Sequence, residues 1–209
     1  YNGGPLNTHR DAPVKMEPPF QFLALGRFVG KKGYDFLLQA CRILADKGLQ
    51  FQLTMAGDGP LAGQLKSLAQ KVGISDRVLF PGFVKYDAVS DLIYKSDMLL
   101  MPSVVHSSGD RDGIPTVIME CLMHRVPVIA TDVSGIAEVI EDGVTGFLIP
   151  EKDAGAIADA VIKMVSDREA SLAMAEAGRA KVLRLFDPER NHRALLELYE
   201  GIPAPAPRP

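Results

Sequence analysis

Two hydrophobic patterns alternate along the chain. Short runs that are almost wholly apolar predict strands buried on both faces of a sheet. They lie at 20–26, 51–56, 78–80, 98–101, 126–131 and 146–149. Between them, apolar residues recur at helical spacing. The helices predicted in this way are 33–47, 61–72, 87–95, 115–124 and 136–141, followed by 154–166, 169–185 and 188–199.

Strands and helices that alternate through short connections predict right-handed crossovers and a parallel sheet covered on both faces. The expected fold class is therefore α/β, a doubly wound Rossmann-like sheet of six parallel strands, with extra helices at the C-terminus. We expect the strand order 3-2-1-4-5-6. Such sheets bind ligands at the carboxyl ends of their strands, near the point where the strand order reverses. Here these positions are the loops 27–32 and 103–114.

Turn-rich and proline-rich segments set the domain boundaries. Residues 1–19 contain Asn-Gly-Gly-Pro and Pro-Pro, and we interpret them as a linker that leaves another domain. Residues 20–200 form the predicted Rossmann-like domain. Residues 201–209 alternate Pro with other residues, which predicts an extended, disordered tail. A chain that starts with Tyr rather than Met is expected to be a fragment of a longer protein.

Composition narrows the choice of partners and compartment. The 23 basic and 26 acidic residues give a formal charge of -3, and nothing in this balance favours nucleic acid. No apolar run approaches the ~20 residues of a membrane span, and the N-terminus lacks the pattern of a signal peptide. Cys41 and Cys121 suggest neither a disulfide framework nor a metal site. Both are expected to be buried, which favours a reduced, cytoplasmic compartment.

Basic residues follow the first predicted strand. Arg27 and Lys32 lie in the loop at the carboxyl end of this strand. Arg offers a planar fork of donors and Lys a movable point charge, so the pair could hold a diphosphate. Alternatively, this is an ordinary solvated basic loop. Lys31 competes with Lys32, and spacing alone does not choose between them.

The segment 109–120 has the sharpest chemical signal. Asp112 lies just before a predicted helix, and Glu120 lies eight positions later. At about 3.6 residues per turn this spacing returns to nearly the same helix face. The N–H groups between the two carboxylates are suited to phosphate, and the carboxylates to hydroxyl groups. The alternatives are a solvated helix face or a salt bridge to Arg111 or Arg125.

Several weaker candidates have ordinary explanations as well. Glycines at 57–59 and 81–83 permit close backbone approach, and the backbone near Phe83 could border a nucleobase; both stretches could also be simple turns. Ser134 precedes a predicted helix, where it could mark a phosphate site or act as an N-cap. His106 could touch a ligand or be solvated.

Several motif classes are missing from the chain. There is no Walker sequence, no Gly-x-Gly-x-x-Gly after the first strand and no His-Glu-x-x-His. The fold is therefore not expected to serve a nicotinamide dehydrogenase. Asp110-Arg111-Asp112 has the letters of a metal–diphosphate clamp but does not directly follow a strand. We predict no metal and no cofactor.

The order and spacing of these segments resemble the retaining glycosyltransferases of the two-domain GT-B architecture, of the group 1 or family 4 type. The likeness runs from residue 1 to 199. Its motifs are Gly-Arg at 26–27 with Lys-Gly at 32–33, Ala-Gly-Asp-Gly-Pro-Leu at 56–61, Phe-Pro-Gly-Phe at 80–83, Ser-Asp at 96–97 with Pro-Ser at 102–103, Gly-Ile-Pro at 113–115 with Glu120, Pro-Val-Ile-Ala-Thr-Asp at 127–132 and Gly-Val-Thr-Gly-Phe at 143–147.

The resemblance implies a role for each candidate residue. Arg27 and Lys32 would bind the donor diphosphate, Glu120 the ribose, and Asp112 would face the sugar as the first acid of the family's Glu-x7-Glu motif. Arg27, Lys32 and Asp112 would be the catalytic residues. The backbone near Phe83 would border the base. The backbone of five further residues would line the sugar and the phosphates. These five are Gly113, Ile114, Pro115, Thr116 and Val117.

The chain departs from the family pattern at several positions. The first acid is Asp rather than Glu, and residues 104–111 lengthen the usual step from Pro-Ser to that acid. Ser134 stands where a second glycine is common. The Asp-Gly-Ile-Pro form suggests a branch that makes polysaccharide or lipopolysaccharide.

We therefore expect the donor-binding domain of a retaining, metal-independent glycosyltransferase that uses a nucleotide-diphosphate sugar of the UDP or GDP type. It would transfer a hexosyl group to an acceptor held by a missing N-terminal domain, so the fragment itself is expected to be inactive. It would act in the cytoplasm or peripherally at the inner face of the membrane. The alternatives are a nucleotide-sugar epimerase of related fold and a non-catalytic nucleotide-sugar-binding module.

Overall fold

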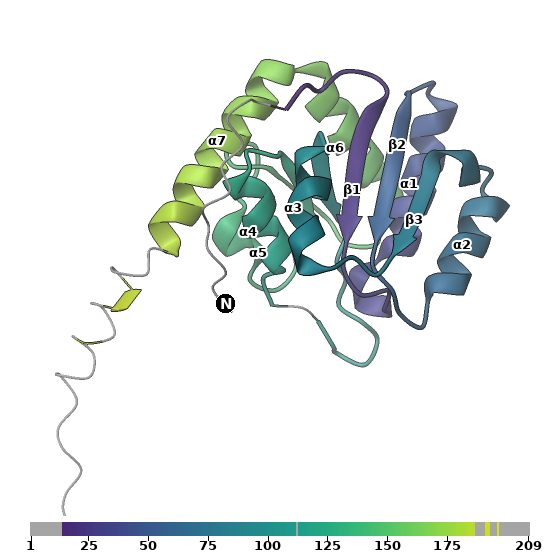
Figure 1. The fold of residues 1–209 in the computed structure, drawn as a ribbon, viewed down its shortest axis with the longest axis horizontal. Coiled ribbons are helices and arrows are strands. Elements are labelled where there is room, and N and C mark those ends of the chain that lie inside the picture. The colour runs from purple at the N-terminus through teal and green to yellow at the C-terminus, as the bar shows by residue number, and fades with distance from the viewer. Residues whose placement is uncertain (1–13, 112, 187–190, 193–195, 197–209) are drawn as a thin grey trace, which may run out of the picture.

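A six-stranded parallel sheet forms the centre of the molecule (Figure 1). The computed structural model describes residues 14–111, 113–186, 191, 192 and 196. The strands are β1 (Phe20–Leu25), β2 (Phe51–Ala56), β3 (Val78–Gly82), β4 (Met98–Met101), β5 (Val128–Thr131) and β6 (Phe147–Ile149). Their order is β3-β2-β1-β4-β5-β6, with every neighbouring pair parallel. The predicted fold class and strand order are confirmed.

Helices cover both faces of this sheet. They are α1 (Tyr34–Asp46), α2 (Ala62–Lys71), α3 (Tyr86–Tyr94), α4 (Thr116–Met123), α5 (Ile136–Val139), α6 (Ala154–Ser166) and α7 (Arg168–Leu185), with short 3-10 turns η1 (Gly30–Lys32) and η2 (Ser75–Arg77). Helices α1 and α6 pack together behind the sheet in Figure 1, whereas α3 and α4 lie in front of it. Helix α7 packs against α4 and α5.

Burial along the strands follows their place in the sheet. All residues of the inner strands β4 and β5 are buried, as expected for strands covered on both faces. The edge strand β3 alternates instead, and Leu79 is 54% exposed. This strand runs on through Pro81 and Gly82, beyond its predicted end.

Strand β5 starts later than predicted, at Val128. The apolar run 126–131 could not reveal this difference, because Val126 is itself fully buried. Its N–H donates to the carbonyl oxygen of Cys121 at 2.9 Å and so belongs to the turn that ends α4.

Asp97 joins the entry of the chain to the sheet. Its carboxylate accepts hydrogen bonds from the backbone N–H of Met16, at 3.0 Å, and of Gln21, at 2.7 Å. Val14 and Met16 are buried in the core. The described part of the predicted linker therefore packs onto the domain. Residues 1–13, most of the predicted helix 188–199 and the tail 201–209 lie outside the described residues.

Candidate functional site

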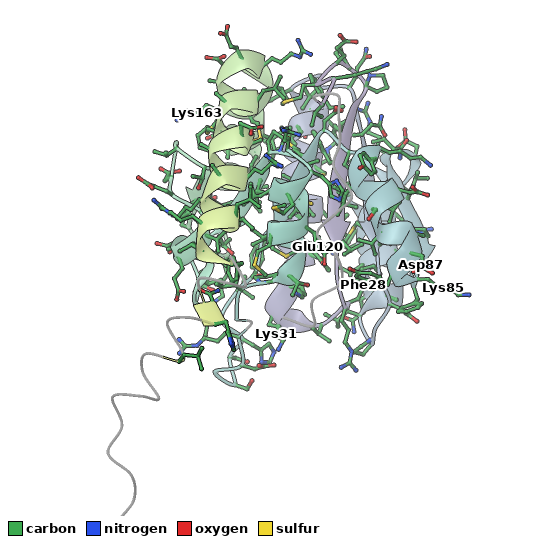
Figure 2. The ribbon with its side chains drawn as sticks, turned by 60° about the vertical axis from the view of Figure 1, so that its left-hand side comes forward. Phe28, Lys31, Lys85, Asp87, Glu120 and Lys163 are labelled. Carbon is green, nitrogen blue, oxygen red and sulfur yellow. The ribbon has the colours of Figure 1, made fainter. Side chains whose placement is uncertain are left out.

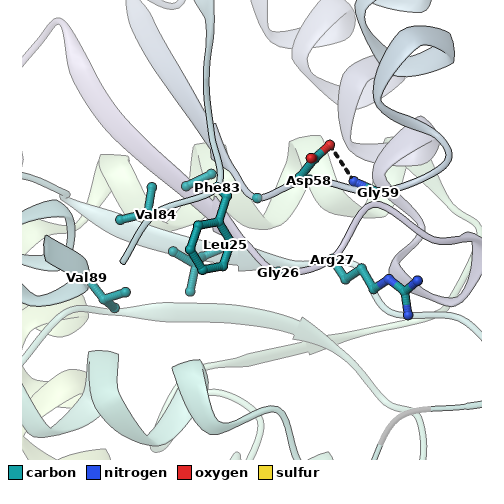
Figure 3. Close-up of a pocket in the computed structure, with 10 residues that line it drawn as sticks. Leu25, Gly26, Arg27, Asp58, Gly59, Phe83, Val84 and Val89 are labelled. Carbon is teal, nitrogen blue, oxygen red and sulfur yellow. Dashed lines mark hydrogen bonds between the residues drawn. The ribbon is translucent and has the colours of Figure 1, made fainter. Parts of the chain in front are cut away.

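The loops after β1, β2 and β3 enclose a pocket of about 510 Å³ at the carboxyl edge of the sheet (Figure 3). Its walls come from Leu25, Gly26, Arg27, Ala56, Gly57, Asp58, Gly59, Phe83, Val84 and Val89. This is the edge where ligands bind in doubly wound sheets. Arg27 and Phe83, two of the predicted site residues, thus lie at the same pocket.

Backbone hydrogen bonds hold these three loops together. The N–H of Gly26 donates to Ala56 at 3.0 Å, and that of Gly57 donates to Gly82 at 2.9 Å. The N–H of Phe28 donates to Asp58 at 2.9 Å, while the Asp58 side chain accepts from Gly59 at 2.7 Å. The pocket is therefore bounded by backbone that is already fixed by the sheet.

The two basic residues predicted to hold a diphosphate come from one connection, between β1 and α1. Arg27 is exposed and lies beside Gly26 on the pocket wall (Figure 3). Lys32 is half-buried and reaches back to the same strand end, because its Nζ is 3.5 Å from the position that a Cβ on Gly26 would take. The structure therefore brings both cations to the carboxyl end of β1.

Lys31 points elsewhere. Its Nζ forms an ion pair with Oδ1 of Asp110 at 3.2 Å. The geometry thus separates the two adjacent lysines that the sequence could not distinguish: Lys31 contacts the loop after β4, and Lys32 the end of β1.

Glu120 lies on the second turn of α4, as the spacing predicted (Figure 2). Its neighbours Met119 and Cys121 are buried, and its own side chain is half-buried. Within the described residues, its carboxylate has neither a hydrogen bond nor an ion pair. Burial raises the pKa of this carboxyl above its ordinary value of 4.5.

Among the described residues, Glu120 forms no salt bridge to Arg111 or Arg125. Arg125 forms its ion pair with Glu176 on α7, and Arg111 is exposed. Burial also raises the pKa of the Cys121 thiol well above 9.0, and the nearby charge of Glu120 adds to the effect. A carboxylate that loses hydration without gaining a protein partner is costly to the fold. Such a group is available for a ligand.

Helix α4 begins at the sheet edge without a side-chain cap. Pro115 occupies the N-cap position, and its side chain offers no acceptor to the first N–H groups of the helix. Ile114 packs against the start of α5, with its Cγ1 3.1 Å from the Cβ position of Gly135. Gly113 and Thr116 are exposed, whereas Pro115 and Val117 are buried. Asp112 lies outside the described residues.

The pocket of Figure 3 covers only part of the predicted site. Lys32, Glu120 and residues 113–117 do not line it. Its apolar walls from Leu25, Val84 and Val89 were not anticipated from the sequence, since isolated apolar residues next to strand ends have no distinctive pattern.

The remaining candidates have structural roles. His106 is exposed, and its Nδ1 lies 2.8 Å from the Oγ of Ser108. Of the two interpretations of Ser134, the N-cap is wrong, because Gly135 holds the N-cap position of α5 and no side chain caps this helix. Ser134 instead has a φ of 55°, which agrees with its position where a glycine is common.

The described part of the chain has neither a metal-binding cluster nor a membrane-spanning helix. No group of three or more His, Cys, Asp or Glu side chains there could hold a metal ion. No helix in these ranges is long and apolar enough to cross a membrane.

The sequence of the chain decides its family. Residues 7–181 match the family described as glycosyl transferases group 1. The chain belongs to the group 1 glycosyltransferases. It is 34% identical over 193 residues to the amylovoran biosynthesis glycosyltransferase AmsK of Erwinia amylovora, an alignment that covers 92% of this chain and 47% of AmsK. It is 32% identical over 192 residues to the putative colanic acid biosynthesis glycosyltransferase WcaL of Escherichia coli, covering 91% of this chain and 47% of WcaL.

Solved structures agree with this assignment at the level of fold. HepE of Anabaena in complex with UDP superposes with a TM-score of 0.76 at 22% identity, over 88% of this chain and 49% of HepE. The C-terminal domain of the group 1 glycosyltransferase LpcC of Francisella tularensis superposes with a TM-score of 0.70 at 22% identity, over 84% of this chain and 87% of that domain. The group 1 chain thus has the Rossmann-like fold of one half of a GT-B enzyme. It spans about half the length of the curated relatives it matches.

Proposed function

We propose that this chain is the donor-binding domain of a retaining glycosyltransferase that takes a hexosyl group from a UDP- or GDP-type sugar without a metal or cofactor. The acceptor would be held by an N-terminal domain, which accounts for the half of each relative that this chain does not match. The names of AmsK and WcaL support a product of the polysaccharide or lipopolysaccharide type. The structure of HepE contains UDP, which supports a nucleotide as the ligand of this fold.

The carboxylate of Glu120, half-buried and without a partner among the described residues, is the observation that carries this proposal. Two vicinal hydroxyls, such as those of a ribose, can each donate a hydrogen bond to one carboxylate. Bonds of this kind to a charged acceptor are worth more than neutral ones. A bound ribose would offset the desolvation that the fold leaves uncompensated.

The other contacts of the proposed donor site follow from the strand ends. Arg27 and Lys32 would bind the diphosphate, together with the uncapped N–H groups of α4. The pocket between β1 and α3, with backbone near Phe83, would receive the base. Asp112 would orient the sugar, and the backbone of Gly113–Val117 would line it.

Leaving-group stabilisation is the chemical task of such a site. Negative charge grows on the diphosphate as the bond to the sugar breaks. Arg27, Lys32 and the N–H groups of α4 would meet this charge in fixed positions, so a metal ion is not required for the task. Retention by front-face attack, assisted by the leaving phosphate, is the course that the resemblance to retaining glycosyltransferases implies.

We also propose that the full protein acts in the cytoplasm or at the inner face of the membrane. The chain alone is expected to bind donor but to transfer nothing, because acceptor contacts would come from the other half. Transfer by this chain alone would disprove the division of labour but not the donor site.

Calorimetry with UDP, GDP, ADP and their sugars tests the donor site directly. At least one nucleoside diphosphate should bind, and Arg27→Ala or Lys32→Ala should weaken it about tenfold or more, the loss of a charge-assisted bond of 1.5–3 kcal/mol. Lys71→Ala is the matched control, since Lys71 is an exposed cation at the last residue of α2. Binding of none of these ligands would reject the proposal, and unchanged affinity in both Ala variants would reject the roles of Arg27 and Lys32.

A further inference from the structure

The loop between β4 and α4 is attached to the connection after β1 by three contacts. The N–H of Val104 donates to the carbonyl oxygen of Lys31 at 2.8 Å. The Nζ of Lys31 pairs with Asp110 at 3.2 Å. The ring of His106 lies over Gly30, so closely that a Cβ there would be 2.8 Å from its Cδ2. The part of the chain with no counterpart in the shorter family pattern is therefore docked on η1.

The same loop also has hydrogen bonds within itself and one to the segment after β6. The N–H of His106 donates to Asp110 at 2.9 Å, and that of Gly109 donates to His106 at 2.8 Å. Glu151, two positions after the end of β6, accepts from the N–H of Val105 at 2.7 Å. Asp110 thus lies where the loop returns toward the sheet, three positions before Gly113.

We propose that Lys31 and Asp110 are positioning residues for the donor sugar, an inference that rests on the proposed function above. Their ion pair fixes the loop just before residues 113–117, the segment that would line the sugar. Lys31 is consequently not a ligand of the diphosphate. The contacts proposed for the nucleotide itself come from Arg27, Lys32, Glu120 and the first N–H groups of α4. They belong to the connection after β1 and to helix α4, and not to this loop.

This arrangement predicts that the Lys31–Asp110 ion pair affects the binding of the sugar and not the binding of the nucleoside diphosphate. Loosening the loop lowers the affinity contributed by the sugar, while the affinity for the bare nucleoside diphosphate is kept. A purely structural role would lower both, or neither. A direct bond from Lys31 to the diphosphate would lower both when Lys31 is changed, and neither when Asp110 is changed.

The test is calorimetry with two ligand pairs, UDP against UDP-glucose and GDP against GDP-mannose, using whichever pair binds. Asp110→Asn and Lys31→Met should each weaken the nucleotide sugar about two- to fivefold, the effect typical of an exposed ion pair. Neither should weaken the nucleoside diphosphate, and the double variant should lose no more than either single one. Asp159→Asn is the matched control, because the ion pair of Asp159 with Lys47 also joins a lysine Nζ to an aspartate Oδ1 at 3.2 Å.

Gly30→Ala supplies a variant that leaves the charges in place. Its new methyl group would displace the His106 ring and so remove one contact of the loop with η1. It should therefore reproduce part of the loss, again for the nucleotide sugar alone. Equal losses for diphosphate and sugar conjugate, or no loss in any variant, would overturn the inference while the proposed function stands. If the unaltered chain binds neither ligand pair, the proposed function fails first.

Discussion

Replacement of Glu120 by Gln separates what this carboxylate costs the fold from what it contributes to binding. The side chain is half-buried on α4, and burial raises its pKa above 4.5. Gln has nearly the same shape but no charge. We therefore expect Glu120→Gln to stabilise the free chain at neutral pH and to weaken nucleotide binding.

The pH dependence of the stability effect has a definite sign. A carboxyl with a raised pKa in the folded state binds its proton more tightly there than in the unfolded chain. The contribution of this carboxyl to the free energy of unfolding is fully present below pH 4.5 and is lost as the pH rises through the raised pKa. The variant has no such loss. Its advantage in the free energy of unfolding should therefore be near zero below pH 4.5, grow with pH and then level off.

The stability difference between the two proteins at the plateau measures how far the pKa of Glu120 is raised in the folded chain. Each tenfold difference between the acid dissociation constants of the folded and unfolded chain is worth about 1.4 kcal/mol. For binding, the variant exchanges charged for neutral acceptor contacts to the ribose. Hydrogen bonds to charged groups contribute about 1.5–3 kcal/mol, so nucleotide affinity should fall roughly 10- to 100-fold.

Urea unfolding of both proteins between pH 4 and 8 gives the first quantity, and calorimetry with UDP or GDP gives the second. Inorganic pyrophosphate is the control ligand: it lacks a ribose, so both proteins should bind it equally. A stability difference that does not change with pH would refute the desolvation argument. Equal nucleotide affinity, or an equal loss for pyrophosphate, would refute the assignment to the ribose.

Three other predictions concern the frame of the site. Gly33→Ala should lower the free energy of unfolding by more than about 3 kcal/mol in urea titrations, because a Cβ there would lie 2.0 Å from a backbone carbonyl oxygen; Gly48→Ala, with a similar positive φ but open space, should lose only about 1 kcal/mol. Asp97→Ala should cost about 2–4 kcal/mol in the same assay, since two backbone N–H groups lose their acceptor; a loss below 1 kcal/mol would mean that water replaces it. Cys41, whose pKa burial raises to about 12, and Cys121 should not react with a thiol reagent at pH 8 until urea unfolds the chain, and reaction of the native chain would contradict their burial.

The fold could be predicted from the sequence because local pattern and topology agreed. The strand at 51–56, for example, was placed with its observed bounds, because the turn residues on either side of the apolar run limit it. Errors occurred where hydrophobicity has more than one cause. Val126 is apolar because it fills the turn after α4. Pro81 has no N–H to donate, but it continues β3 because an edge strand tolerates a missing donor.

The candidate site was predictable only in part. Glu120 stood out as a charge among apolar neighbours, and its helix position is confirmed. Lys31 and Lys32 could not be distinguished, because the difference depends on Asp110, nearly eighty positions further along the chain. The resemblance to a family, not the spacing, favoured Lys32. Asp97 gave no local sign that its carboxylate would accept two distant backbone N–H groups.

Three residues of the proposed site have one property in common: the fold gains little from them. Phe83 is 77% exposed although its ring is apolar, Arg27 is exposed, and Glu120 is desolvated without a partner in the described chain. Asp97 is the opposite case, since its carboxylate is fully used by the backbone. If the site exists to bind a nucleotide sugar, ligand binding must supply the contacts that the first three residues lack. Variants at these three positions should therefore reduce binding more than stability, whereas Asp97→Ala should reduce stability first.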